Sequence, residues 1–360
     1  MILHIFNPEH EMALAIDKAI FTLSHNIQEL RTNLGFLPAL WADDGDAVLV
    51  DDISFAVKAL KQIKRKHNDV LFLTEDDIHD IPFTEIKPWG WDVNIKHSLL
   101  ASGIKPELLP DNDKLLRIKD LSSRKQTEYL LPVLRNEIEG LTCGESLFTD
   151  DIHAVVGYIE LHENTVIKTP WSSSGRGIRY VNRDNINKPL LYWVSNIIRN
   201  QGGISIEPYY NKVKDFAMEF MADSNGMVTY CGLSVFDTEK CNYHGNLIAS
   251  EDVKNNILSK YIGRELLDIT RERIKTQMQE MLKGVYCGPF GVDMMIVARD
   301  NGKGYLLHPC VEINLRNTMG HLANALYDKN HDIDMMMHIV HDVNYRLKID
   351  YIGNIYTKVI

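Results

Sequence analysis

The apolar positions in the N-terminal part of the chain alternate between two spacings. The short apolar runs at 1–6, 47–50 and 70–73 have the length and the Ile, Leu and Val content of strands, whereas residues 11–20 and 53–63 carry apolar side chains at three- and four-residue intervals. Strands that alternate with helices pair in parallel, because each helix returns the chain to the same end of the sheet. This pattern predicts an α/β domain with a parallel sheet.

The middle of the chain is predicted to hold two strands, at 165–169 and 178–181, on either side of a loop of small residues at 172–177. A helix at 190–199 then leads to a further strand at 204–207. This part of the chain therefore also mixes strands and helices.

The segments around this middle part complete the prediction. A helix runs to about residue 134, with Ser122 or Ser123 as its N-cap. The last third is predicted to contain two long helices, at 257–283 and 333–346, and four strands, at 217–221, 227–236, 292–297 and 305–314.

Composition and charge narrow the class of protein. The 360 residues are 45% hydrophobic and 24% charged, with a net charge of -10 at pH 7. This balance is typical of a soluble globular protein and lacks the basic face that nucleic-acid binding needs. No apolar run reaches the roughly 18 to 20 residues that span a bilayer, and the start of the chain lacks the pattern of a secretory signal. The five cysteines form no close CxxC pair, which favours reduced thiols. We therefore expect a cytoplasmic protein without a nucleic-acid or membrane partner.

The segment 311–316 places three polar side chains on one face of an otherwise apolar strand. Successive strand residues point to opposite faces, so Glu312, Asn314 and Arg316 lie together. Upstream, Asp293 is the one charged residue within an apolar run. Two buried acids repel each other and lose hydration unless a cation or a proton holds them. Since Mg²⁺ prefers oxygen ligands, the pattern predicts a magnesium site on these strands.

The loop at 172–177 reads Ser-Ser-Ser-Gly-Arg-Gly, and its small residues let backbone amides surround an anion. Lys168, on the strand before the loop, can reach the same anion as a point charge. The loop lacks the Gly-Lys-Ser or Gly-Lys-Thr that opens a helix in the common nucleotide triphosphatases. It predicts a phosphate site of another class, although Ser and Gly clusters are more often simple turns.

A carboxylate and two tyrosines stand where the next strand ends. Pro208 removes a backbone donor there, so the segment from Glu207 to Tyr209 offers free backbone groups and a carboxylate to an adenine ring. Aromatic packing at a strand end explains the same residues. On the following strand Asp215 and Glu219 share a face, and either can bond a ribose hydroxyl.

The order of these pieces resembles the ATP-grasp superfamily: a lysine before a small-residue loop, Glu-Pro-Tyr-Tyr, then Gly-Val-Asp, and finally Glu-Ile-Asn-Leu-Arg. The resemblance covers about residues 120–320. It departs from the family form at Leu315, where proline is usual, and in a loop that is serine-rich where many members are glycine-rich. It implies an α/β (α+β) ATP-grasp fold, with an N-terminal parallel-sheet pre-ATP-grasp domain at 1–113, a central lid lobe at 114–206 and a C-terminal lobe with the metal-binding strands at 207–360.

The resemblance also implies roles for the matching residues. Arg316 stabilises charge on the transferring phosphoryl group or acyl phosphate, together with Lys168, and His244 stands where family members place substrate or phosphate contacts. The implied contacts to the nucleotide are Arg124 or Lys125, Lys168, Ser173, Ser174, Gly175, Arg176, Gly177, Glu207, Tyr209, and Glu219 or Asp215. The implied ligands of Mg²⁺ are Asp293, Glu312 and Asn314.

The activity implied by the resemblance is that of an enzyme that uses ATP and Mg²⁺ to activate a carboxylate as an acyl phosphate and joins it to an amine or a similar nucleophile. Its substrates are then a small-molecule carboxylate and a small-molecule amine, and a homodimer is one expected assembly. Two alternatives stay open: a small-molecule kinase that uses the same site without ligation, and a nucleotide-binding regulatory module. The turn at 7–10 and the aromatic loop at 88–92 are candidates for substrate contacts.

Overall fold

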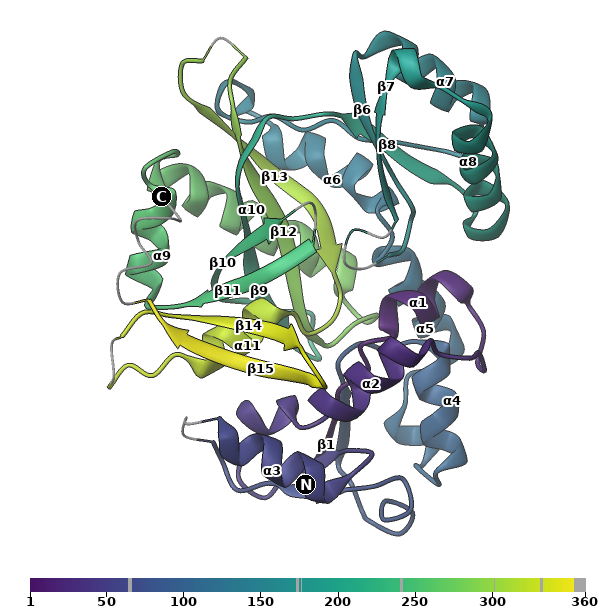
Figure 1. Ribbon diagram of the computed structural model, residues 1–360, viewed down its shortest axis with the longest axis vertical. Helices are drawn as coiled ribbons and strands as arrows, with labels where there is room; N and C mark the ends of the chain where they lie inside the picture. Colours follow the sequence, from purple (N-terminus) through teal and green to yellow (C-terminus); the bar gives the residue numbers. More distant parts are fainter. Residues whose placement is uncertain are drawn as a thin grey trace.

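Three β-sheets organise the chain (Figure 1). The computed structural model describes residues 1–63, 67–172, 175, 177–239, 242–300, 302–330 and 333–352. A four-stranded parallel sheet lies at the N-terminal end, a second four-stranded sheet forms a separate lobe, and a seven-stranded antiparallel sheet lies between them in Figure 1. None of the helices within these ranges is long and apolar enough to cross a membrane.

The N-terminal sheet confirms the predicted parallel arrangement. Its order is β3-β2-β1-β4, with β1 (Ile2–Ile5), β2 (Ala47–Leu49), β3 (Leu71–Leu73) and β4 (Glu85–Pro88). The accompanying helices are α1 (His10–Ile16), α2 (His25–Leu34), α3 (Ile53–Gln62) and α4 (Val93–Ala101). The first helix ends at Ile16 and not at residue 20, because Asp17 adopts a left-handed conformation with φ 54° that stops the helix.

Two further helices and the second four-stranded sheet follow; the sequence analysis predicted this part of the chain as a lid lobe. α5 (Asn112–Leu121) and α6 (Lys125–Arg135) lead to the second sheet, whose order is β5-β8-β6-β7 with β5 (Leu147–Thr149), β6 (Asn164–Lys168), β7 (Ile178–Asn182) and β8 (Ile204–Pro208). α7 (Ile152–Leu161) and α8 (Lys188–Gln201) pack on this sheet through a small core that includes Ile159, Ile167 and Val194 (Figure 1). The N-terminal region and the region of the second sheet also contain short 3₁₀ helices: η1 (Leu37–Leu40), η2 (Pro106–Leu108), η3 (Glu139–Leu141) and η4 (Arg183–Asn185).

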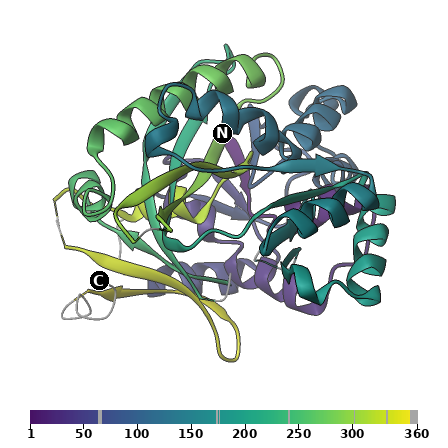
Figure 2. The ribbon, with the colours of Figure 1, turned by 90° about the horizontal axis from the view of Figure 1, so that it is seen from above.

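Around β9, β12 and β13 the seven-stranded sheet has one face that packs in an apolar core and one face that carries polar side chains. Its order is β13-β12-β9-β10-β11-β14-β15, with β9 (Lys212–Ala222), β10 (Val228–Glu239), β11 (Asn242–Ile248), β12 (Gly288–Ala298), β13 (Tyr305–Asn314), β14 (Met335–His341) and β15 (Tyr345–Tyr351). On β9, Phe216 and Phe220 face a core that α6 and α10 (Arg264–Leu282) cover, and α10 runs along one side of the sheet in Figure 2. The alternate residues of β9 therefore face the other way, toward the lid lobe.

The prediction of a helix at 333–346 is wrong. The segment forms a hairpin of β14 (Met335–His341) and β15 (Tyr345–Tyr351), and β14 pairs with β11. Met335 and Met337 are buried and Met336 is only partly buried, which is the period of two expected of a strand. Pairing with a free sheet edge thus outweighs the helix preference of methionine.

Two other boundaries differ from the prediction. The segment 257–283 is two helices, α9 (Glu251–Leu258) and α10, with Gly263 in an extended conformation at the start of the second. Ser122 ends α5 and does not cap α6, whose N-cap residue is Arg124 without a side-chain cap bond. The last helix, α11 (Met319–Leu326), directly follows β13. The domain boundaries at 113/114 and 206/207 stay a prediction.

Candidate functional site

A cavity of about 850 Å³ lies between the β5-β8-β6-β7 sheet and the face of the seven-stranded sheet that carries polar side chains. In the described part of the chain its lining includes most of the predicted site residues: Arg124, Lys168, Gly175, Glu207, Tyr209, Asp215, Glu219, Asp293, Glu312, Asn314 and Arg316. Gly177 and His244 are not among these lining residues. Ser173, Ser174 and Arg176 lie outside the described residues.

The predicted magnesium ligands face each other across two neighbouring strands. Asp293 on β12 pairs with Glu312 on β13, and two residues along the ladder Asn314 pairs with Gly291. Burial, followed by the charges of Glu312 and Glu219, raises the pKa of Asp293 to about 8. Ionising both carboxylates is therefore unfavourable unless a cation lies between them.

This donor set fits Mg²⁺. Two carboxylates and one carboxamide supply hard oxygen ligands and leave other coordination positions for phosphate oxygens and water. Within the described ranges no three His, Cys, Asp or Glu side chains form a group that could hold a metal ion by themselves. A nucleotide would have to complete such a site, as it does in many phosphoryl-transfer enzymes.

Arg124 connects the start of α6 to both walls of the cavity. Its guanidinium donates to Glu312 Oε1 at 2.7 Å, and on the other side to the Thr169 carbonyl at 2.7 Å and to Ser172 Oγ at 2.9 Å. Lys125 instead places its Nζ 5.8 Å from the Phe148 ring. Of the two basic residues that the sequence left open, Arg124 is the one that lines the cavity.

Lys168 and Glu207 form an ion pair between β6 and β8. Both side chains are buried, so each charge depends on the other. Beside them, Tyr209 packs edge-on against Tyr180 with ring centroids 5.9 Å apart. Apolar side chains and this aromatic pair line the same end of the cavity, which suits a flat ring such as adenine.

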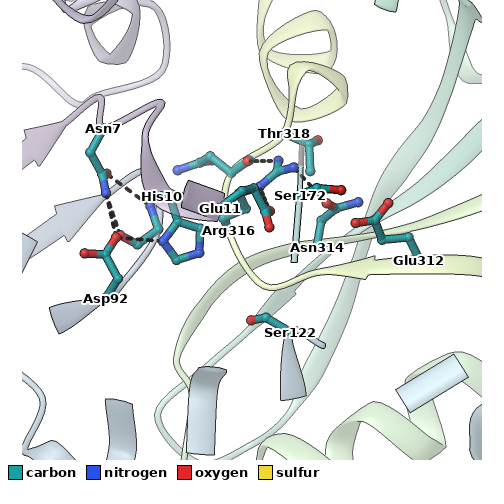
Figure 3. Close-up of polar contacts among 12 residues, drawn as sticks. Asn7, His10, Glu11, Asp92, Ser122, Ser172, Glu312, Asn314, Arg316 and Thr318 are labelled. Carbon is teal, nitrogen blue, oxygen red and sulfur yellow. Dashed lines mark hydrogen bonds and ion pairs between the residues drawn. The ribbon is translucent and has the colours of Figure 1, made fainter. Parts of the chain in front are cut away.

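Arg316 is held from two sides (Figure 3). Its Nε donates to Glu11 Oε1 at 2.8 Å, and its Nη2 donates to Asn314 Oδ1 at 2.8 Å. Burial alone would lower the pKa of Arg316, but the charge of Glu11 and the nearby acids outweigh it and raise that pKa. Burial alone would raise the pKa of Glu11, but Arg316 outweighs it, so the net shift is downward. Both partners therefore carry their charge in this contact.

Glu11 was not predicted as a site residue, and it comes from the N-terminal domain. The contact is supported by a β-bridge between Gly90 and Arg316 and by a hydrogen bond from Asn317 N to the Trp89 carbonyl at 2.8 Å. The available sequence signal was the polar turn at 7–10 directly before Glu11, at the end of β1. Ligands of open α/β sheets gather at that end of the strands.

The turn itself is buried in a network of its own (Figure 3). His10 Nδ1 lies 2.9 Å from Asp92 Oδ2, with side chains only 2% and 1% exposed. Asn7 Nδ2 donates to the Gly90 carbonyl at 2.9 Å. A Cβ at position 90 would overlap the His10 ring, so glycine is required for this close approach. Asn7 and His10 thus position α1, and through it Glu11.

Asp215 and Glu219 lie at different positions along the cavity. On β9, Asp215 is opposite Met295 and Glu219 is opposite Gly291, with the Asp293 position between them. His244 is exposed, and its ring packs edge-on against His338 with centroids 5.6 Å apart. Its neighbour Asn246, which the sequence analysis did not single out, reaches the cavity instead.

Comparison with known proteins identifies the fold. No protein-family profile and no curated protein sequence matches the chain. The biotin carboxylase domain of 2-oxoglutarate carboxylase from Hydrogenobacter thermophilus, a dimer in complex with MgADP, ADP and bicarbonate, has a TM-score of 0.54 at 12% identity. That match covers 94% of this chain and 74% of that one.

Two other solved structures are similar at lower scores. The N5-carboxyaminoimidazole synthetase of Staphylococcus aureus, complexed with ADP, has a TM-score of 0.47 at 12% identity, over 94% of this chain and 82% of that one. D-cycloserine synthetase has a TM-score of 0.44 at 13% identity, over 90% of this chain and 97% of that one. The structural similarity, with the motif order along the strands of the cavity, shows that this chain has the ATP-grasp fold.

Proposed function

We propose that the protein is an ATP- and Mg²⁺-dependent ligase that activates a small-molecule carboxylate as an acyl phosphate and joins it to an amine. The observation that carries the proposal is the paired strand positions of Asp293 and Glu312, which share one cavity with the cations Arg124, Lys168 and Arg316. Carboxylates that can bind a metal ion, together with cationic side chains that can exchange a carboxylate partner for a phosphate, are the complement of a metal-bound polyphosphate. The nucleotides bound in the similar structures agree with this proposal.

The reaction has two steps. An oxygen of the substrate carboxylate forms a bond to the terminal phosphorus of ATP, the bond from that phosphorus to the bridging oxygen breaks, and ADP leaves. The amine nitrogen then forms a bond to the acyl carbon, the carbon–oxygen bond to phosphate breaks, phosphate leaves with the electron pair, and the amine loses a proton to solvent. No side chain forms a covalent bond with substrate.

The residues of the chain position these groups and neutralise their charge. Lys168 and Arg124 lie where they can bind the phosphates, and the apolar end near Tyr209 holds the adenine. Arg316, fixed by Glu11 and Asn314, offers a guanidinium that needs no reorganisation when charge develops on the transferring group. Mg²⁺ held by Asp293, Glu312 and Asn314 would supply further charge neutralisation on the phosphates.

A screen tests the proposal. The protein is incubated with MgATP and a panel of amino acids and small carboxylates, ADP release is followed over time, and products are identified by mass spectrometry. A ligated product that needs both a carboxylate and an amine supports the ligase. Glu312→Gln is expected to abolish ADP release, whereas Glu163→Gln, on an exposed residue of the lid lobe, is the control.

Each other outcome has a distinct meaning. A stable phosphorylated product without ligation would instead indicate the kinase. Binding of MgATP without ADP release across the whole panel would indicate the regulatory module. Failure to bind MgATP at all would contradict the proposal and both alternatives.

A further inference from the structure

Arg124 is bound to one of the predicted magnesium ligands. Its Nη2 donates to Glu312 Oε1 at 2.7 Å, in an ion pair whose side chains are 5% and 19% exposed. Among the described residues, Glu312 is the acid that forms an ion pair with this guanidinium. A short hydrogen bond between two charged groups is one of the stronger polar contacts in a protein, and a partly buried one is little screened by salt. Arg124 therefore holds a carboxylate that the proposed metal ion also needs.

The other hydrogen bonds that the described residues make with the Arg124 guanidinium come from neutral acceptors. Nη1 donates to the Thr169 carbonyl at 2.7 Å and to Ser172 Oγ at 2.9 Å, and Nη2 donates to the Ser172 carbonyl at 3.2 Å. These bonds fix the guanidinium at the wall of the cavity but do not balance its charge. When Glu312 binds a metal ion instead, the positive charge of Arg124 stays in the cavity and requires another anion.

The place of Arg124 in the fold adds to this requirement. Arg124 is the N-cap residue of α6, and its side chain makes no cap hydrogen bond. The N-terminal end of a helix carries a partial positive charge, so a cation there is unfavourable by itself and a nearby anion is favoured. This position therefore favours the exchange of one anion for another over the loss of both.

Mg²⁺ and Arg124 compete for the Glu312 carboxylate. A carboxylate that already neutralises a guanidinium attracts a second cation less, on either of its oxygens, because two positive charges at short distance repel each other. A phosphate group removes this conflict. It accepts hydrogen bonds from the guanidinium, and its oxygens can share the metal ion with Glu312. The nucleotide thus supplies the anion that Arg124 loses when Glu312 becomes a metal ligand.

We propose that the ion pair of Arg124 and Glu312 makes the binding of metal and nucleotide mutually dependent. Each side chain blocks its partner's ligand until both ligands are present, so the protein binds Mg²⁺ alone and metal-free nucleotide weakly. Such coupling is reciprocal, and one ion pair therefore sets both effects. The inference rests on the ligase function proposed above and gives Arg124 a role beyond its phosphate contact. A phosphate contact without this role would leave the affinity for the metal alone unchanged.

Replacing Arg124 tests the metal side of the coupling by a gain of binding. Mn²⁺ takes the same oxygen ligands as Mg²⁺ and serves as the probe, and electron paramagnetic resonance measures its free concentration. Without nucleotide, Arg124→Met should bind Mn²⁺ at least fivefold more tightly than the unmodified protein, although it should bind MnADP more weakly. Adding Asp293→Asn should abolish the gain, because Asp293 is paired with Glu312 on the neighbouring strand. Arg117→Met, at an exposed position of α5, is the control and should change neither affinity.

Replacing Glu312 tests the nucleotide side. Calorimetry with ADP in the presence of EDTA measures binding without metal. Glu312→Gln keeps the shape of the side chain but removes the charge that holds the guanidinium, so it should bind metal-free ADP at least fivefold more tightly. The exposed Glu163→Gln is the matched control and should bind it as the unmodified protein does.

The inference is overturned if Arg124→Met does not bind Mn²⁺ more tightly, if its gain survives Asp293→Asn, or if Glu312→Gln does not bind metal-free ADP more tightly. Because both expected effects are gains, a variant that fails to fold cannot imitate them, and the other variant then decides. Binding of MnADP to the unmodified protein is read separately. Its failure counts against the proposed ligase, whereas MnADP binding without these gains counts against the coupling alone.

Discussion

Replacing Asp293 by asparagine is expected to stabilise the free protein while it removes a ligand of the proposed magnesium site. In the folded chain burial and two neighbouring acids raise the pKa of this carboxyl from its ordinary value of 3.8 to about 8. At pH 7 it is therefore mostly protonated when folded and ionised when unfolded, so unfolding releases a proton. Stability from this group is complete below pH 3.8 and is lost as the pH rises toward 8.

The size of the effect follows from that difference. One pKa step corresponds to about 1.4 kcal/mol, so keeping Asp293 protonated at pH 7 costs about 4 kcal/mol relative to the unfolded chain. Asparagine does not ionise, but it changes the hydrogen bond with Asn314, which is worth about 1 kcal/mol. We expect the variant to be more stable by about 3 kcal/mol, or about 4 °C in Tm for a chain of this length.

Thermal unfolding in the presence of a chelator, between pH 4 and pH 8, measures this prediction. The gap between Asp293→Asn and the unmodified protein should be largest at pH 8 and nearly absent at pH 4. MgADP should then raise the Tm of the unmodified protein more than that of the variant. A variant that is less stable at pH 7, or a gap that does not change with pH, would refute the reasoning.

Three further predictions concern other contacts. Glu11→Gln should lower kcat for ADP release about 10- to 100-fold with little change in KM for ATP. The reason is that the substitution weakens a charge-assisted hydrogen bond to Arg316 that is worth about 1.5 to 3 kcal/mol. An equal rise in KM would contradict a positioning role for Glu11. Lys168→Met should weaken MgADP binding at least tenfold in calorimetry and, by leaving Glu207 buried without its cation, lower the free energy of unfolding by about 3 kcal/mol. Met337→Ala, at a fully buried site in the hairpin, should cost about 2 to 5 kcal/mol in denaturant unfolding, whereas Met336→Ala should cost much less; equal losses would argue against the strand.

The sequence by itself determined which side chains share a face. Strand side chains alternate with a period of two whatever the strand packs against, so Glu312 and Asn314 had to lie together. Arg316 lies two residues past the end of β13 and meets Asn314 through a side-chain hydrogen bond. The same local rule separates Asp215 and Glu219 from Phe216 and Met218, which face the apolar core. Motif order along the chain then predicted the fold, because elements that follow one another with fixed spacing leave few ways to build the sheets.

Only the tertiary structure decided which distant residues meet. Whether Arg124 or Lys125 enters the cavity depends on how α6 packs on the sheet. Because neighbouring residues of a helix point in different directions, a rotation of the helix about its axis would exchange the two. Residues at 333–346 became strands because β11 offered an edge to pair with. Glu11 meets Arg316 across a separation of 305 residues. Such contacts depend on the packing of whole domains, a property that no local pattern of hydrophobic and polar residues records.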